Sequence, residues 1–195
     1  MRALGILNQP SHDMPIERLA SNFFNLATQY YVSARAATHA GLLPVPGNLF
    51  HHAIELFLKG DLCNSISADD LKKKLGHHLP LLWDAFRSRH PGEDFSAFAP
   101  CIAALDAFEG IRYPDEVVGK GMYSTISIGP FTPHIETPGV PLPGYHIVVQ
   151  DLDAIIGLIF RKGAVNPKFH FGSLSAEAKA SLLRDNLTFS AQDCG

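Results

Sequence analysis

The chain has 195 residues, 46% of them hydrophobic, and a formal net charge of −3 at pH 7. This length suits one domain with a sizeable core. The slightly acidic balance excludes a general attraction to nucleic acid, so RNA contact would need a local basic patch. No apolar run approaches the ~20 residues that cross a bilayer. The three cysteines form an odd set without metal-ligand spacing, which is typical of free thiols in a reducing compartment. We therefore expect a cytoplasmic protein with no membrane contact.

The first part of the chain has the pattern of a long helix. We expect a lead-in over residues 1–14 and the core of a helical bundle over residues 15–118. Apolar positions from Ile16 recur at steps of three and four residues as far as Gly41, which predicts an amphipathic helix. Its second half is rich in small side chains that allow close packing, and Arg35 lies on the flank of the apolar stripe.

Residues 48–62 predict the central helix of the bundle. Asn48 suits the N-cap and Gly60 suits a C-terminal stop. The segment is apolar around most of its circumference, so it should have neighbours on several sides. Its polar residues form one line: His51, Glu55 and Lys59, with His52 beside them. Glu55 and Lys59 have the favourable order for an i,i+4 pair, and a carboxylate buried there needs such a partner.

Short helices should follow, over residues 67–75, 79–89 and 96–109. Ser67 and Asp70 give the first of them a start that resembles a capping box. His77 or His78 should cap the helix that begins at Leu79.

The last third of the chain changes character. Residues 119–150 are dense in glycine and proline and hold two short β-type runs, at 123–128 and 145–149, which predict a β-hairpin insertion. Residues 151–195 should complete the bundle with helices over 151–162, capped by Asp151, and 176–187, capped by Ser175.

Four motifs in this order carry a family resemblance. They are the small-residue half of the first helix, Ala53-x-Glu55-x-x-Leu58-Lys59, the His77-His78-Leu79-Pro80-Leu81-Leu82 segment, and Arg112-Tyr113-Pro114. The ordered set resembles the HEPN family, helical domains named for higher eukaryotes and prokaryotes nucleotide binding. The resemblance covers roughly residues 20 to 116 plus a final helix.

The resemblance implies a mainly α fold, a HEPN-like bundle of four to five helices with the small β insertion, and a homodimer without a cofactor. Many members of the family are metal-independent ribonucleases, or partners of nucleotidyltransferases in prokaryotic toxin–antitoxin, defence or stress systems. The ribonucleases use an arginine followed by four to six residues and then a histidine. No arginine of this chain has a histidine at that spacing. The resemblance therefore favours binding of RNA or a nucleotide-type phosphate over cleavage.

The candidate site combines residues of three motifs. Arg112 and Lys59 would hold phosphate, Glu55 would orient one of them, and Tyr113 would complete the binding surface. His78 is the acid–base candidate and would act with Arg112 if the protein is a ribonuclease with a non-standard arginine–histidine pair. No metal site is expected, because the single His52-x-x-Glu55 pair lacks the repeats of a di-metal bundle.

Two alternatives to this site stay open. Glu55 and Lys59 can form an internal salt bridge that only fixes helix packing, and Arg112 can pair with Glu55 or Glu109 in the same way. The protein would then be a structural dimerisation or interaction module. The Lys72–Lys74 run is more typical of a solvated helix face than of a phosphate-binding patch.

Overall fold

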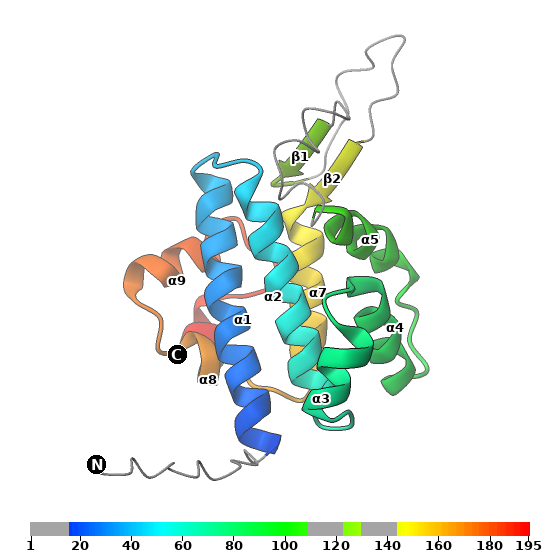
Figure 1. Cartoon of the computed structure of the whole chain (residues 1–195). Helices are drawn as coiled ribbons and strands as arrows, with labels where there is room; N and C mark the ends of the chain where they lie inside the picture. The colour runs from blue at the N-terminus through cyan, green and yellow to red at the C-terminus, as the bar shows by residue number, and fades with distance from the viewer. Residues whose placement is uncertain (1–15, 109–122, 130–143) are drawn as a thin grey trace, which may run out of the picture.

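A computed structural model describes residues 16–108, 123–129 and 144–195. The predicted mainly α fold is confirmed, with one two-stranded sheet in the described part. Helices α1 (Ile16–His39) and α2 (Val45–Leu62) form a long pair, and α7 (Val149–Lys162) lies behind α2 (Figure 1). Helices α4 (Leu79–Arg89) and α5 (Ala99–Ala107) flank α2 on one side, and α8 (Lys168–Phe171) and α9 (Ala176–Leu183) flank α1 on the other.

The central helix extends beyond its predicted cap and stop. It begins at Val45, after Pro44 at the N-cap, because Pro46 in its first turn needs no amide partner. Asn48 is therefore an interior residue. Gly60 does not end the helix either, because α2 continues to Leu62. A Cβ at Gly60 would lie 2.7 Å from the ring of Phe24 in α1. The glycine serves close packing of α1 on α2 instead of termination.

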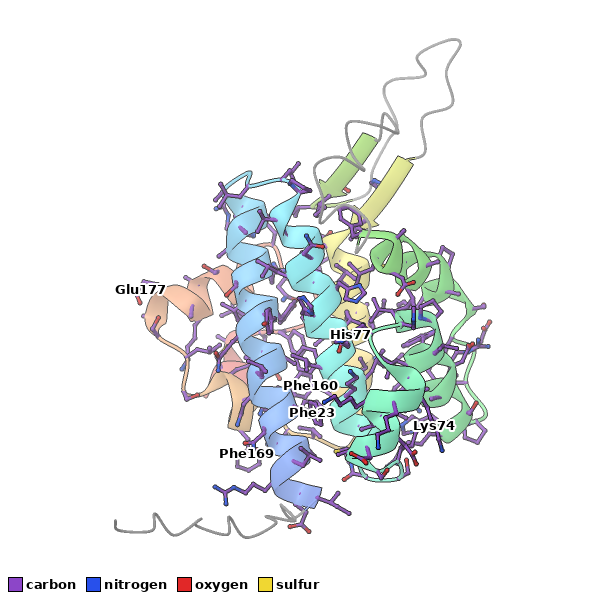
Figure 2. All side chains as sticks on the ribbon, in the orientation of Figure 1. Phe23, Lys74, His77, Phe160, Phe169 and Glu177 are labelled. Atoms are coloured by element: carbon purple, nitrogen blue, oxygen red, sulfur yellow. The ribbon has the colours of Figure 1, made fainter. Side chains whose placement is uncertain are left out.

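Aromatic side chains fill the centre of the bundle. The ring centroid of Phe160 in α7 lies 5.2 Å from that of Phe24 in α1 and 5.3 Å from that of Phe57 in α2. Figure 2 shows Phe160 inside the bundle. Helix α7 begins at Val149 without a side-chain cap, so the predicted cap at Asp151 is wrong. These three helices enclose the aromatic core. The polar residues Glu55 and Lys59 lie on another face of α2.

The shorter elements follow the predicted order. They are α3 (Ala68–Asp70), the π-helix η1 (Leu71–Leu75), and the 3₁₀ helices η2 (Ser96–Phe98) and η4 (Ala191–Cys194). Ser67 and Ser175 cap their helices as predicted, each accepting a backbone N–H three residues on. Helix α9 ends at Leu183 instead of near Leu187, because the chain turns at Asp185 (φ 53°) and brings Asn186 toward α1.

The two strands lie where the sequence predicts, but they pair in parallel. β1 (Tyr123–Ser127) and β2 (Gly144–Val148) align Tyr123 with Gly144 and Ser127 with Val148. The predicted hairpin is therefore wrong in strand direction, since a hairpin is antiparallel. Ile147 of β2 is fully buried, which anchors the sheet at the α5 end of the bundle.

The start of α4 is capped from another helix. The backbone N–H of Leu79 donates to Asp106 Oδ1 at 2.9 Å, whereas His78 at the N-cap gives no side-chain bond and His77 turns toward α2. The prediction that a histidine caps α4 is therefore wrong. The carboxylate of Asp106 also has a charge that suits the positive end of a helix dipole.

Replacing Asp106 with alanine should lower the unfolding free energy by about 1 kcal/mol, the usual contribution of an N-cap side chain. Urea denaturation followed by circular dichroism measures this change. His78→Ala is the matched control and should leave the unfolding free energy within about 0.5 kcal/mol of the parent value. An effect of His78→Ala larger than that of Asp106→Ala would show that the histidine is the cap.

Candidate functional site

The polar line of α2 converges on one carboxylate. Glu55 is 3% exposed, and its Oε1 accepts hydrogen bonds from Lys59 Nζ at 2.6 Å and from His77 Nδ1 at 3.0 Å. Lys59 comes from the next turn of α2, and His77 comes from the loop between η1 and α4. Because a carboxylate only accepts, the proton of this bond lies on Nδ1 of His77. The predicted Glu55–Lys59 pair is thus present, with a histidine added to it.

Two more histidines of α2 surround the second oxygen of Glu55. His52 Nδ1 lies 3.6 Å and His51 Nε2 lies 4.0 Å from Oε2. No described residue makes a hydrogen bond to Oε2, although the atom is buried. His51, His52, Glu55, Lys59 and His77 together form the Glu55 cluster.

His51 ties the cluster to two neighbouring segments. Its Nδ1 lies 3.3 Å from the carbonyl oxygen of Leu105 in α5, and its Nε2 lies 3.2 Å from the carbonyl oxygen of His77. Carbonyl oxygens only accept, so both contacts are hydrogen bonds only when both ring nitrogens carry protons. A neutral ring donates to one of these two oxygens, and in the tautomer with the proton on Nε2 it bonds the backbone of the loop that carries His77.

The Glu55 carboxylate stays ionised in this setting. Burial raises the pKa of Glu55, but hydrogen bonds and charge from Lys59 and His77 outweigh it and bring the pKa below its ordinary value. At neutral pH the ionised carboxylate is therefore paired with the ammonium of Lys59 and accepts a second hydrogen bond from His77.

Exposure differs sharply within the cluster. Lys59 is 8% exposed, whereas the side chain of His77 is 68% exposed. Figure 2 shows His77 beside α2, away from Phe169 and Glu177 on the opposite side of the molecule. Nδ1 of this imidazole bonds Glu55, and no residue of the described ranges is hydrogen-bonded to Nε2. The cluster thus combines a buried ion pair, Glu55 with Lys59, and an exposed imidazole, that of His77.

The predicted site residues have different fates. Glu55 and Lys59 meet, and His77 instead of His78 reaches them. His78 lies exposed at the start of α4. Arg112 and Tyr113 lie outside the described residues, as does Glu109. Over the described ranges, no group of three or more His, Cys, Asp or Glu side chains has an arrangement that could hold a metal ion.

A second buried ionic cluster escaped sequence analysis. Arg35 Nη1 donates to both carboxylate oxygens of Asp153, at 2.7 and 2.6 Å, and Tyr31 Oη donates to Oδ1 at 2.5 Å. Arg35 also bonds the carbonyl oxygens of Ser181 and Arg184. These contacts join α1, α7 and the end of α9. Each nitrogen of the guanidinium and the Tyr31 hydroxyl bond to a partner within the protein, which makes this cluster structural.

This second cluster is closed to solvent. Burial and the neighbouring Asp153 raise the pKa of Tyr31 well above its ordinary value, so the phenol stays a neutral donor. Arg35 is fully buried and Asp153 nearly so. The one sequence signal is Asp153 itself, an acid within the apolar run of α7 that needs a buried partner.

A third buried carboxylate ties the ends of α2 and α4 together. Asp61 Oδ2 lies 3.2 Å from His90 Nε2 and 3.4 Å from Arg89 Nε. The ring of His90 also packs on Phe86, with centroids 4.7 Å apart. Together these contacts hold the C-terminal end of α4 on the end of α2.

Comparison with protein-family models, curated proteins and solved structures gave no match. Within the described ranges, no helix combines the length and apolar character needed to cross a bilayer.

Proposed function

We propose that this protein is a HEPN-like domain that binds RNA or a nucleotide-type phosphate at the Glu55 cluster. The observation that carries the proposal is the shared acceptor: Lys59 Nζ and His77 Nδ1 both donate to Oε1 of Glu55. One buried carboxylate thus holds two groups that commonly contact phosphate at one place, and one of them is largely exposed.

The donor capacity of the cluster supports this proposal. An ammonium has three N–H donors, and Glu55 uses one of those of Lys59. The imidazole of His77 presents Nε2, which donates to a phosphate when the ring is protonated. With a net charge of −3 over the whole chain, phosphate binding needs such a local set of donors.

The wider setting follows from the resemblance. Arg112 would supply a bidentate phosphate contact and Tyr113 would complete the binding surface. A homodimer, a nucleotidyltransferase-type partner, and a place in a prokaryotic toxin–antitoxin, defence or stress system belong to the same proposal.

A second candidate function is metal-independent RNA cleavage. The contact between Glu55 and His77 favours it, because a carboxylate on Nδ1 orients the ring and leaves Nε2 for proton transfer. Arg112 would stabilise the phosphate. RNA cleavage in EDTA tests this candidate, with the parent compared with His77→Ala, His78→Ala and Arg112→Ala. Equal cleavage by the parent and all three variants would exclude it.

Replacing His77 with alanine, or Lys59 with methionine, should weaken RNA binding roughly ten- to hundredfold. A hydrogen bond to a charged group contributes about 1.5–3 kcal/mol, and about 1.4 kcal/mol corresponds to a factor of ten in Kd. Fluorescence anisotropy with labelled RNA at two salt concentrations measures the change, and circular dichroism establishes that each variant is folded.

Lys73→Met is the matched control for Lys59→Met. Lys73 also pairs with an acid one turn away, at 2.8 Å from Asp69, but both side chains are exposed on the surface. Its replacement should change affinity by less than about twofold. Equal losses in Lys59→Met and Lys73→Met would point to diffuse electrostatic attraction and would exclude a site at Glu55.

A further inference from the structure

An aromatic pair links the Glu55 cluster to α1 through His52, which belongs to both. The rings of Tyr30 and His52 have centroids 5.3 Å apart and planes inclined at 44°. His52 in turn lies 3.6 Å from Glu55, so the pair and the cluster form one continuous chain of contacts from α1 to the loop before α4. Both rings are partly exposed, and the exposed Leu26 lies one turn before Tyr30 on the same helix face.

We infer that Tyr30 and His52 form a stacking platform for a nucleobase, and that the ligand of the Glu55 cluster is single-stranded RNA. The inference rests on the proposed phosphate site. Partly exposed aromatic rings beside phosphate donors are the usual means of holding an unpaired base, because every base has a face that stacks on an aromatic ring. In duplex RNA the bases are paired and stacked on one another, and only phosphate and ribose contacts remain.

The order of these residues also sets which part of the ligand each of them contacts. The side chain of His52 is 34% exposed and lies between Tyr30 and Glu55, so one ring can contact a base while His77 contacts the adjoining phosphate. A free phosphate would use only the donors Lys59 and His77 and leave the aromatic pair unused. The pair therefore distinguishes an unpaired nucleotide from inorganic phosphate and from a duplex.

The test compares two probes of equal length, a labelled single-stranded oligoadenylate and a labelled RNA duplex, at two salt concentrations. Tyr30→Leu and His52→Leu should weaken single-strand binding about tenfold, the effect of losing one stacked base. Their salt dependence should stay that of the parent, because no phosphate contact is removed. Tyr30→Phe and His52→Phe keep a ring and should restore affinity.

The control is Phe169→Leu, which removes an exposed aromatic ring from α8, far from His77 in Figure 2, and should have no effect. Unchanged single-strand affinity in Tyr30→Leu and His52→Leu, with a loss in His77→Ala, would overturn the stacking platform and leave the phosphate site intact. Equal binding of duplex and single strand by the parent would overturn the ligand class. No binding of either probe would overturn this inference and the RNA-binding form of the proposed function together.

Discussion

Replacing Asp153 with alanine is expected to lower the unfolding free energy by about 3–5 kcal/mol, the range found when one partner of a buried ion pair is removed. The guanidinium of Arg35, fully buried, would lose both oxygens that it bonds at 2.6–2.7 Å. Tyr31 would lose its acceptor as well. Chemical denaturation at neutral pH, with circular dichroism as the readout, measures the change.

A double-mutant cycle separates the pair from its surroundings. Arg35→Met alone should also destabilise, because Asp153 would then be a buried charge without its main partner. The double variant should cost less than the sum of the two single changes. Asp84→Asn removes an exposed pair with Arg87 and should stay within about 0.5 kcal/mol. An Asp153→Ala effect as small as that of Asp84→Asn would contradict the structural role of the cluster.

Much of the helical layout could be predicted because helices have a strong local signal. The 3.6-residue period placed α1, α2 and α7, and the serines at 67 and 175 marked two helix starts. The Glu55–Lys59 contact was also predictable, since i,i+4 partners are set by helix geometry alone.

Features that depend on distant segments escaped prediction. Arg35 and Asp153 are 118 positions apart, and no local pattern links them. Asp106 caps a helix that begins 27 residues earlier. The strands pair in parallel, and His77 contacts Glu55 where His78 does not. Both features depend on the path of the connecting loops, which has no local signal in the sequence. The helix stop predicted at Gly60 was wrong, because the glycine is there to allow close contact with Phe24 of another helix.

Replacing Glu55 with glutamine should lower the unfolding free energy by about 3–5 kcal/mol, because the nearly buried ammonium of Lys59 loses its counter-charge. The matched control is Asp69→Asn, which removes the same i,i+4 pairing from an exposed site and should cost at most about 0.5 kcal/mol. Urea denaturation of both variants measures the difference.

The effect of Glu55→Gln should also depend on pH. The pKa of Glu55 in the folded protein is below its ordinary value of 4.5. Between the two values the unfolded chain binds a proton that the folded protein does not, so stability rises with pH there. The contribution of Glu55 is therefore complete above about pH 4.5 and is lost as the pH falls through the folded-state pKa. The difference in unfolding free energy between the parent and Glu55→Gln should therefore become smaller as the pH is lowered.

The RNA affinity and the stability of Glu55→Gln and Lys59→Met together decide between a binding site and a structural salt bridge. Lys59→Met removes a proposed phosphate donor and leaves Glu55 with His77, whereas Glu55→Gln removes the acceptor that positions both donors. A binding site requires both variants to lose RNA affinity under conditions in which both are fully folded. A salt bridge that only fixes packing requires lower stability in both and parent-like affinity in any ligand assay. A Glu55→Gln variant with parental stability at every pH would contradict both roles, because the carboxylate would then contribute nothing to the folded state.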